Sequence, residues 1–96
     1  MSEPLLYQKL NLETARIAWH ELQPHFARGA VVAVTADADL PQVAEWMAQD
    51  NAAQIARLLA DKTLFTPDAD TARRWYAENC EMWAVVVAPW VVVQEQ

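Results

Sequence analysis

The sequence predicts a single α+β domain over residues 1–96, in which about five short helices surround a small three-stranded sheet with mixed or parallel pairing. Two apolar runs predict strands, since residues 82–93 carry no charged or polar side chain and residues 30–34 are also continuously apolar. Elsewhere apolar residues recur at intervals of three and four, as on one face of a helix. Helical segments lie between the strands, which favours parallel or mixed pairing over a meander.

The first half of the chain is predicted to contain two helices and then a strand. Residues 4–16 repeat leucine and alanine roughly as a helix does. A second helix follows, since apolar side chains from Trp19 onward are again three and four residues apart, and it ends at Gly29. Glycine tolerates the left-handed conformation that closes many helices. The strand at residues 30–35 comes directly after this glycine.

The second half is predicted to contain helices at 41–49 and 51–60, a strand at 62–66, a helix from Thr66 to about Asn79 and a final strand at 82–94. Pro89 lies inside the final strand and cannot donate a hydrogen bond to a ladder. The common two-residue hairpin turns need positive φ, which proline cannot adopt. A bend within one strand is therefore predicted, rather than a hairpin at Ala88-Pro89.

The final strand is expected to be buried on both faces. Valine favours a pleated, packed surface, and the alternation of polar and apolar side chains that marks a half-exposed strand is missing. The residues predicted to be almost fully buried are Trp83, Val85, Val86 and Val87.

The charge balance and the counts of glycine and cysteine exclude several classes of function. Lys and Arg number 7 against 13 Asp and Glu, and the formal net charge of −6 repels nucleic acid and anionic lipid surfaces. Gly29 is the only glycine, whereas phosphate-binding loops and dinucleotide fingerprints need several. Cys80 is the only cysteine and no secretory signal pattern opens the chain, so the cytoplasm is the expected compartment. No cofactor, nucleic-acid partner or membrane attachment is expected.

Two aspartate loops form a candidate metal site. Each follows a predicted strand and precedes a predicted helix, and the candidate ligands are Asp37, Asp39, Asp68 and Asp70. If the strands run parallel, both loops leave the same end of the sheet, where four carboxylates are able to hold a hard cation such as Mg²⁺. Aspartate is also a preferred helix cap, and capping alone accounts for both loops. Capping is therefore the favoured interpretation.

Three further patterns point to chemistry only weakly. His20 and His25 resemble part of a zinc-protease helix, but a separation of five residues places them about 140° apart around a helix. Cys80 follows a predicted helix C-terminus, where the helix dipole disfavours a thiolate nucleophile. The two middle helices resemble a helix-turn-helix that would present Gln54 and Arg57 to DNA, but few cations are nearby for phosphate contacts. No catalytic residue is assigned.

Three residues are predicted to contact a protein partner. Trp46 lies beside Glu45 and off the apolar stripe of its helix, which leaves it exposed. The final strand is longer than the two short strands that can pair with it, so the segment after Pro89 is predicted to overhang as an uncharged edge. Trp90 and Val92 on this edge would then pair or pack with a second copy of the chain.

Three segments carry a family resemblance: Leu12–Leu22, Phe26–Gly29 and above all Met82–Val91, which reads Met-Trp-Ala-Val-Val-Val-Ala-Pro-Trp-Val. They resemble an uncharacterised bacterial family, the domain of unknown function 2288, over nearly the whole chain. The resemblance implies a small stand-alone bacterial protein, and it assigns no activity and no site residue.

The sequence favours a small acidic cytoplasmic interaction module, either a homo-oligomer or an adaptor, without catalysis. The alternative is a small-molecule or divalent-metal-dependent enzyme that uses the aspartate loops. A deep polar pocket at those loops would favour the enzyme, and a flat exposed apolar patch would favour the interaction module.

Overall fold

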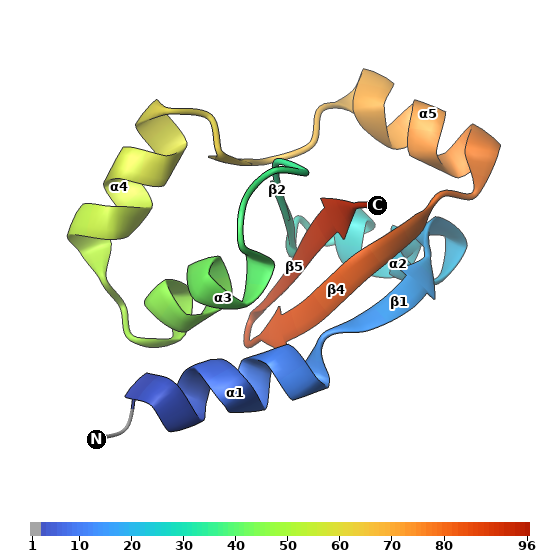
Figure 1. The fold of residues 1–96 in the computed structure, drawn as a ribbon. Helices are drawn as coiled ribbons and strands as arrows, with labels where there is room; N and C mark the ends of the chain where they lie inside the picture. Colours follow the sequence, from blue (N-terminus) through green and yellow to red (C-terminus); the bar gives the residue numbers. More distant parts are fainter. Residues whose placement is uncertain (1–2) are drawn as a thin grey trace.

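The chain forms one five-stranded sheet with helices packed on both faces (Figure 1). The computed structural model describes residues 3–96. In chain order the elements are α1 (Glu3–Glu13), β1 (Ala15–Ala18), α2 (Trp19–Ala27), β2 (Val31–Val34), α3 (Leu40–Ala48), α4 (Ala52–Ala60), β3 (Leu64–Phe65), α5 (Ala69–Glu78), β4 (Glu81–Val87) and β5 (Trp90–Glu95). The strand order is β1-β4-β5-β2-β3, so the C-terminal strand β5 lies at the centre of the sheet.

The sheet is mixed. β5 runs parallel to β2 and antiparallel to β4, and the edge strands β1 and β3 each pair antiparallel with their neighbour. Three helices lie in the connection between β2 and β5, as the crossover of a parallel pair requires. The strands predicted at 30–35 and 62–66 are present as β2 and β3, the latter only two residues long. The predicted α+β class, five helices and mixed pairing are confirmed, but the sheet has five strands rather than three.

The single strand predicted at 82–94 is wrong, because this segment forms the hairpin of β4 and β5. Val87 pairs with Trp90 across a loop that consists of Ala88 and Pro89. The peptide bond between these two loop residues is cis, and a turn with cis-proline at its third position needs no residue with positive φ. Proline at position 89 rules out only the hairpin turns that need positive φ. A hairpin with another type of turn can still form here.

β1 is the second strand that the sequence pattern did not predict. The helix predicted at 4–16 ends at Glu13, and the segment Ala15–Ala18 pairs with β4, with Ala15 opposite Ala84. The segment is only four residues long and contains two alanines, which favour helices. Its strand conformation therefore comes from pairing with β4 rather than from local propensity.

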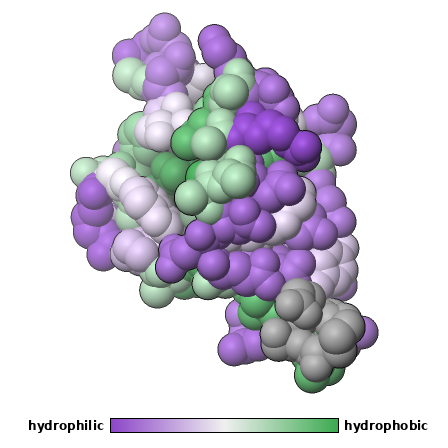
Figure 2. All heavy atoms as spheres, turned by 90° about the vertical axis from the view of Figure 1, so that its left-hand side faces the viewer, coloured by the Kyte–Doolittle hydropathy of each residue, from purple (hydrophilic) through white to green (hydrophobic). Residues whose placement is uncertain are grey.

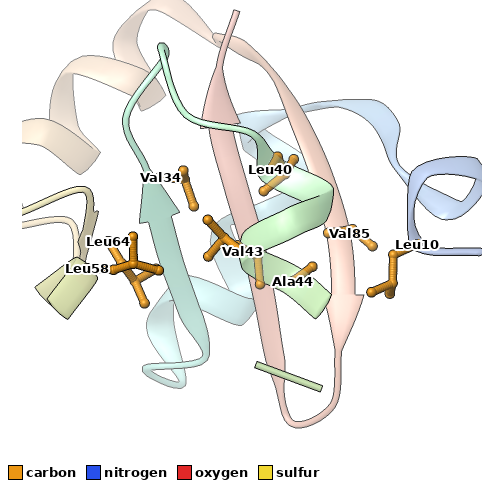
Figure 3. Packing of buried hydrophobic residues seen from close by; sticks show 9 residues of the cluster. Leu10, Val34, Leu40, Val43, Ala44, Leu58, Leu64 and Val85 are labelled. Atoms are coloured by element: carbon orange, nitrogen blue, oxygen red, sulfur yellow. The ribbon is translucent and has the colours of Figure 1, made fainter. Parts of the chain in front are cut away.

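Each face of the sheet has its own hydrophobic cluster. On the face that we call the α3 face, α1, α3 and α4 cover the sheet, and Figure 3 shows α3 lying over β4 and β5. The buried side chains of this cluster are Leu10, Val34, Leu40, Val43, Ala44, Leu58, Leu64, Val85 and Val92. They come from α1, α3, α4 and the four strands β2 to β5, so this cluster joins the β3 edge of the sheet to its centre.

On the opposite face, which we call the α2 face, α2 and α5 cover the sheet. The rings of Trp19 and Trp75 contact each other there, with centroids 5.0 Å apart. The buried side chains of this cluster are Trp19, Leu22, Val31, Ala33, Ala72, Trp75, Met82, Val91 and Val93. Two of the five tryptophans thus pack α2 against α5.

Near the hairpin loop, only one of the two faces of the C-terminal run is buried. The prediction of burial is correct for Val85, which is 1% exposed, and wrong for Val86, which is 63% exposed. Trp83 is also exposed, and Val87 is only half-buried. Successive side chains of β4 point to opposite faces, and the hairpin loop lies at the end of the sheet away from α5 (Figure 1). Val86 therefore points to the part of the α2 face that the helices leave open.

Candidate functional site

The two aspartate loops leave opposite ends of the sheet. β2 and β3 pair antiparallel, with Val34 opposite Leu64, so the loop after β2 and the loop after β3 run in opposite directions. The parallel arrangement that would bring the four carboxylates together is therefore wrong. Within residues 3–96, no three His, Cys, Asp or Glu side chains are gathered closely enough to hold a metal ion.

The first loop caps α3. The Asp39 carboxylate accepts a hydrogen bond from the backbone N–H of Gln42 at 3.4 Å and another from the Tyr7 hydroxyl at 2.9 Å. The bond to Asp39 raises the pKa of Tyr7, because it stabilises the protonated hydroxyl. Asp37 is exposed. The loop thus ties the start of α3 to α1.

The second loop caps α5 through Asp68. Its carboxylate accepts the backbone N–H of Thr71 at 2.8 Å, and this bond lowers the pKa of Asp68. Since the pKa is lower in the folded protein, the cap stabilises the fold above the ordinary carboxyl pKa and loses this effect as the pH falls through the lowered value. Asp70 lies inside α5 and pairs with Arg73 on the surface. The sequence pattern therefore identifies the loop correctly, and the capping residue in it is Asp68.

Asp39→Ala is expected to lower the free energy of unfolding by about 1 kcal/mol, because α3 loses its N-cap. Asp70→Ala is the matched control, since Asp70 caps no helix, and its effect should be much smaller. Urea denaturation followed by circular dichroism measures both. Equal losses in the two variants would contradict the assignment of the caps.

Cys80 and the histidines make local packing contacts. The half-buried Cys80 thiol lies 3.2 Å from a carboxylate oxygen of Glu78, and burial, followed by that hydrogen bond, raises the pKa of Cys80. A raised pKa is the reverse of what a thiolate nucleophile needs. His20 bonds through Nε2 to the backbone oxygen of Tyr76 at 3.0 Å, and their rings lie 4.5 Å apart. His20 thus fastens α2 to α5.

The predicted partner contacts have unequal exposure. β5 is paired on both sides, so the predicted overhang after Pro89 does not exist, and Val92 is fully buried between the sheet and α3. Trp46 is half-buried and packs against the cluster on the α3 face. Trp90 is 40% exposed. Of these three, only Trp90 presents a substantial apolar surface to a partner.

Trp90 lies beside the junction of α3 and α4. Together with Met47, Asp50, Ala52 and Ile55 it lines a hollow of about 310 Å³. Figure 2 shows the side of the molecule that carries α4, where apolar side chains gather in the middle of hydrophilic surroundings. The Trp90 ring forms part of the wall of this hollow.

Val86 has a larger exposed fraction than Trp90, and it lies on the α2 face near the hairpin loop. We call the apolar area around it the Val86 surface and define it by five residues: Ala15 and Ile17 of β1, Ala84 and Val86 of β4, and Val91 of β5. They share one face, because Ala15 pairs with Ala84 and Val86 pairs with Val91. The surface lines a shallow hollow of about 220 Å³.

The rim of the Val86 surface contains an acidic residue and a histidine that contacts an arginine. Glu13, at the end of α1, and His25 of α2 both line the hollow. The guanidinium of Arg28 lies against Nδ1 of His25. β1 is the adjoining edge strand, and its outer backbone groups have no neighbouring strand in the described sheet. An apolar centre, a charged rim and a free strand edge therefore meet in one place.

Sequence reasoning missed the Val86 surface because Val86 lies between two other valines, and nothing in the sequence distinguishes it from the buried Val85. The signal that identifies it is the two-residue loop at Ala88-Pro89. A hairpin there fixes which face each side chain of β4 points to and brings Val86 close to the loop, beyond the helices.

The fold and the site define a small layered α+β domain that exposes an apolar area on a sheet. No helix within residues 3–96 has the length and hydrophobicity to cross a lipid bilayer. The chain belongs to the family described as a protein of unknown function, DUF2288, whose model matches residues 5–95. The family resemblance seen in the sequence is therefore confirmed.

The fold is similar to that in the NMR solution structure of PA1075 from Pseudomonas aeruginosa. The two chains are 48% identical, the match covers 96% of this chain and 85% of that chain, and the TM-score is 0.84. No curated protein matches the sequence.

Proposed function

We propose that the protein is a small interaction module that forms a homodimer through the Val86 surface and has no catalytic activity of its own. The exposure of Val86 within a continuous apolar area carries this proposal. Covering exposed apolar area with another surface lowers the free energy, because that area is removed from water. The alternative, a small-molecule or divalent-metal enzyme at the aspartate loops, lacks comparable support because those loops leave opposite ends of the sheet.

The rim charges favour a second copy as the partner. Two copies with a formal net charge of −6 repel each other over most of their surfaces. At the Val86 surface, however, the lining residues include Glu13 and also His25, which Arg28 contacts from outside the hollow. In a two-fold dimer, a contact between one residue of the first copy and a different residue of the second copy occurs twice, because the symmetry repeats it. Glu13 of each copy would then face Arg28 of the other.

The area that a stable interface must bury is larger than the five apolar residues provide, so the rim must contribute buried area too. A stable interface buries about 800 Å² per partner, which is about one seventh of the 5831 Å² of exposed surface on this chain. Ala15, Ile17, Ala84 and Val86, which lie around the buried Val91, supply the centre of such an interface, and polar groups around them supply the remainder. The free edge of β1 adjoins the centre, so we include its backbone groups in the interface.

We further propose that the module works in the bacterial cytoplasm. Its single cysteine, Cys80, forms no internal disulfide, as is usual for proteins of reducing compartments. The similar structure comes from the bacterium Pseudomonas aeruginosa. The net negative charge of the chain disfavours binding to nucleic acid, which is also negatively charged.

Charge reversal across the rim tests the two-fold arrangement. Glu13→Arg and Arg28→Glu each place like charges opposite each other in the dimer, and each is expected to weaken dimerisation at least about tenfold. The double variant restores opposite charges with their signs exchanged and should regain most of the affinity. Sedimentation velocity over a concentration series at low salt compares these variants with the wild type. A double variant as weak as either single variant would contradict the reciprocal contact.

A further inference from the structure

Gln94 is a buried polar residue at the end of the valine run of β5, and only 8% of it is exposed. Its side-chain nitrogen donates hydrogen bonds to the backbone oxygens of Thr35 at 2.8 Å and Ala38 at 2.7 Å. These bonds use both amide hydrogens, so the orientation of the amide group is set. The amide oxygen Oε1 accepts no hydrogen bond from another group within residues 3–96 and is not fully enclosed, so it remains available as an acceptor.

Gln94 lines a hollow of about 220 Å³ on the α3 face, where α1, α3, β4 and β5 meet. The lining residues are Asn11, Thr14, Leu40, Pro41, Trp83 and Gln94. Trp83 is the direct cross-strand neighbour of Gln94 and is 38% exposed. Leu40, at the start of α3 beside β5, is labelled in Figure 3. The hollow therefore combines a fixed acceptor with an aromatic wall and an aliphatic wall.

The charges around this hollow favour a neutral ligand. The Arg16 guanidinium lies over the Trp83 ring, 5.6 Å from its centroid, and 3.7 Å from the Glu81 carboxylate. A cation already interacts with this ring, so a second cation there would be repelled. An anion without a donor would place its oxygens against Oε1 of Gln94, which only accepts. A neutral group with an N–H donor meets neither penalty.

We propose that the Gln94 hollow binds a small, planar, neutral ligand that has an N–H donor, such as an aromatic carboxamide. Its N–H donates to Oε1 of Gln94, its ring packs against Trp83, and Asn11 supplies a polar group at the rim. A volume of about 220 Å³ corresponds to roughly seven waters at about 30 Å³ each, which suits a single substituted ring. This site lies on the face opposite the Val86 surface and does not depend on the dimer.

Benzamide and benzoate are matched probes for this site, since they share size and ring but only benzamide is neutral and carries N–H donors. Titration of the ¹⁵N-labelled full chain with benzamide should shift the indole N–H signal of Trp83 and the side-chain NH₂ signals of Gln94 in a saturable way. Benzoate should bind at least about tenfold more weakly, because its carboxylate oxygens would lie against the acceptor Oε1 with no donor between them. This comparison uses the wild-type chain and does not depend on whether a variant folds.

Two tryptophan variants locate the ligand. Trp83→Val should weaken benzamide binding at least about tenfold, because the aromatic wall is lost. Trp90→Val is the matched control, since Trp90 is similarly exposed on the same face of the sheet, and it should bind benzamide like the wild type. The absence of saturable shifts with benzamide, equal binding of benzoate, or unchanged binding in Trp83→Val would each overturn the proposal.

Discussion

Val85→Asp is expected to abolish cooperative folding, whereas Val86→Asp is expected to remain folded. The two valines are adjacent in β4, but Val85 points into the cluster on the α3 face and Val86 points to the open part of the α2 face. An aspartate at position 85 would bury a carboxylate without a partner, which costs several kcal/mol. A domain of this size is stable by only about 5–15 kcal/mol.

Thermal and urea denaturation followed by circular dichroism distinguish the two variants. Val86→Asp should keep a cooperative transition, because its carboxylate stays hydrated. Since both variants add the same charge to the same strand, charge alone cannot separate them. If the Val85→Asp variant melts cooperatively, or if Val86→Asp is unfolded, the placement of β4 between the two helix layers is wrong.

Trp75→Ala is expected to lower the free energy of unfolding by about 3–5 kcal/mol, the usual cost of truncating a large buried aromatic side chain. Trp75 is almost completely buried and packs against Trp19 between α5 and the sheet. Its indole N–H has no hydrogen-bond partner within residues 3–96, so the loss comes from packing rather than from a broken hydrogen bond. The linear dependence of stability on urea concentration provides the measurement.

Trp90→Ala is the control for this loss. Trp90 is 40% exposed, so the same substitution removes much less buried area and should cost less than half as much. Equal losses in Trp75→Ala and Trp90→Ala would show that the α2–α5 cluster is not a main source of stability.

Most helices and two strands were predictable because they carry local signals. Asp39 and Pro41 mark the start of α3, and the short valine run before Thr35 is a strand by composition. β1 was not predictable, because Ala15–Ala18 has no strand signal and becomes a strand only by pairing with β4. The β4–β5 hairpin was not predicted, because the cis peptide at Pro89 permits a turn that positive-φ rules exclude.

The candidate site depended on facts that the sequence does not contain. The aspartate loops were correctly placed at the starts of helices, but whether they meet depends on the direction of β3 relative to β2. Val86 and Val92 have the same side chain in the same apolar run, yet one is exposed and the other is fully buried. Their difference follows from the hairpin and from the positions of α2 and α5, which are properties of the whole fold.

Sedimentation equilibrium of the full-length chain tests the proposed homodimer most directly. At micromolar concentrations the wild type should sediment with twice the monomer mass of 10.9 kDa. Val86→Asp should sediment as a monomer, because it places a charge at the centre of the apolar contact. Leu59→Asp is the matched control: Leu59 is an exposed leucine on α4, away from the Val86 surface, and this variant should remain a dimer. A wild type that is strictly monomeric, or a dimer that Val86→Asp leaves intact, would contradict self-association through the Val86 surface.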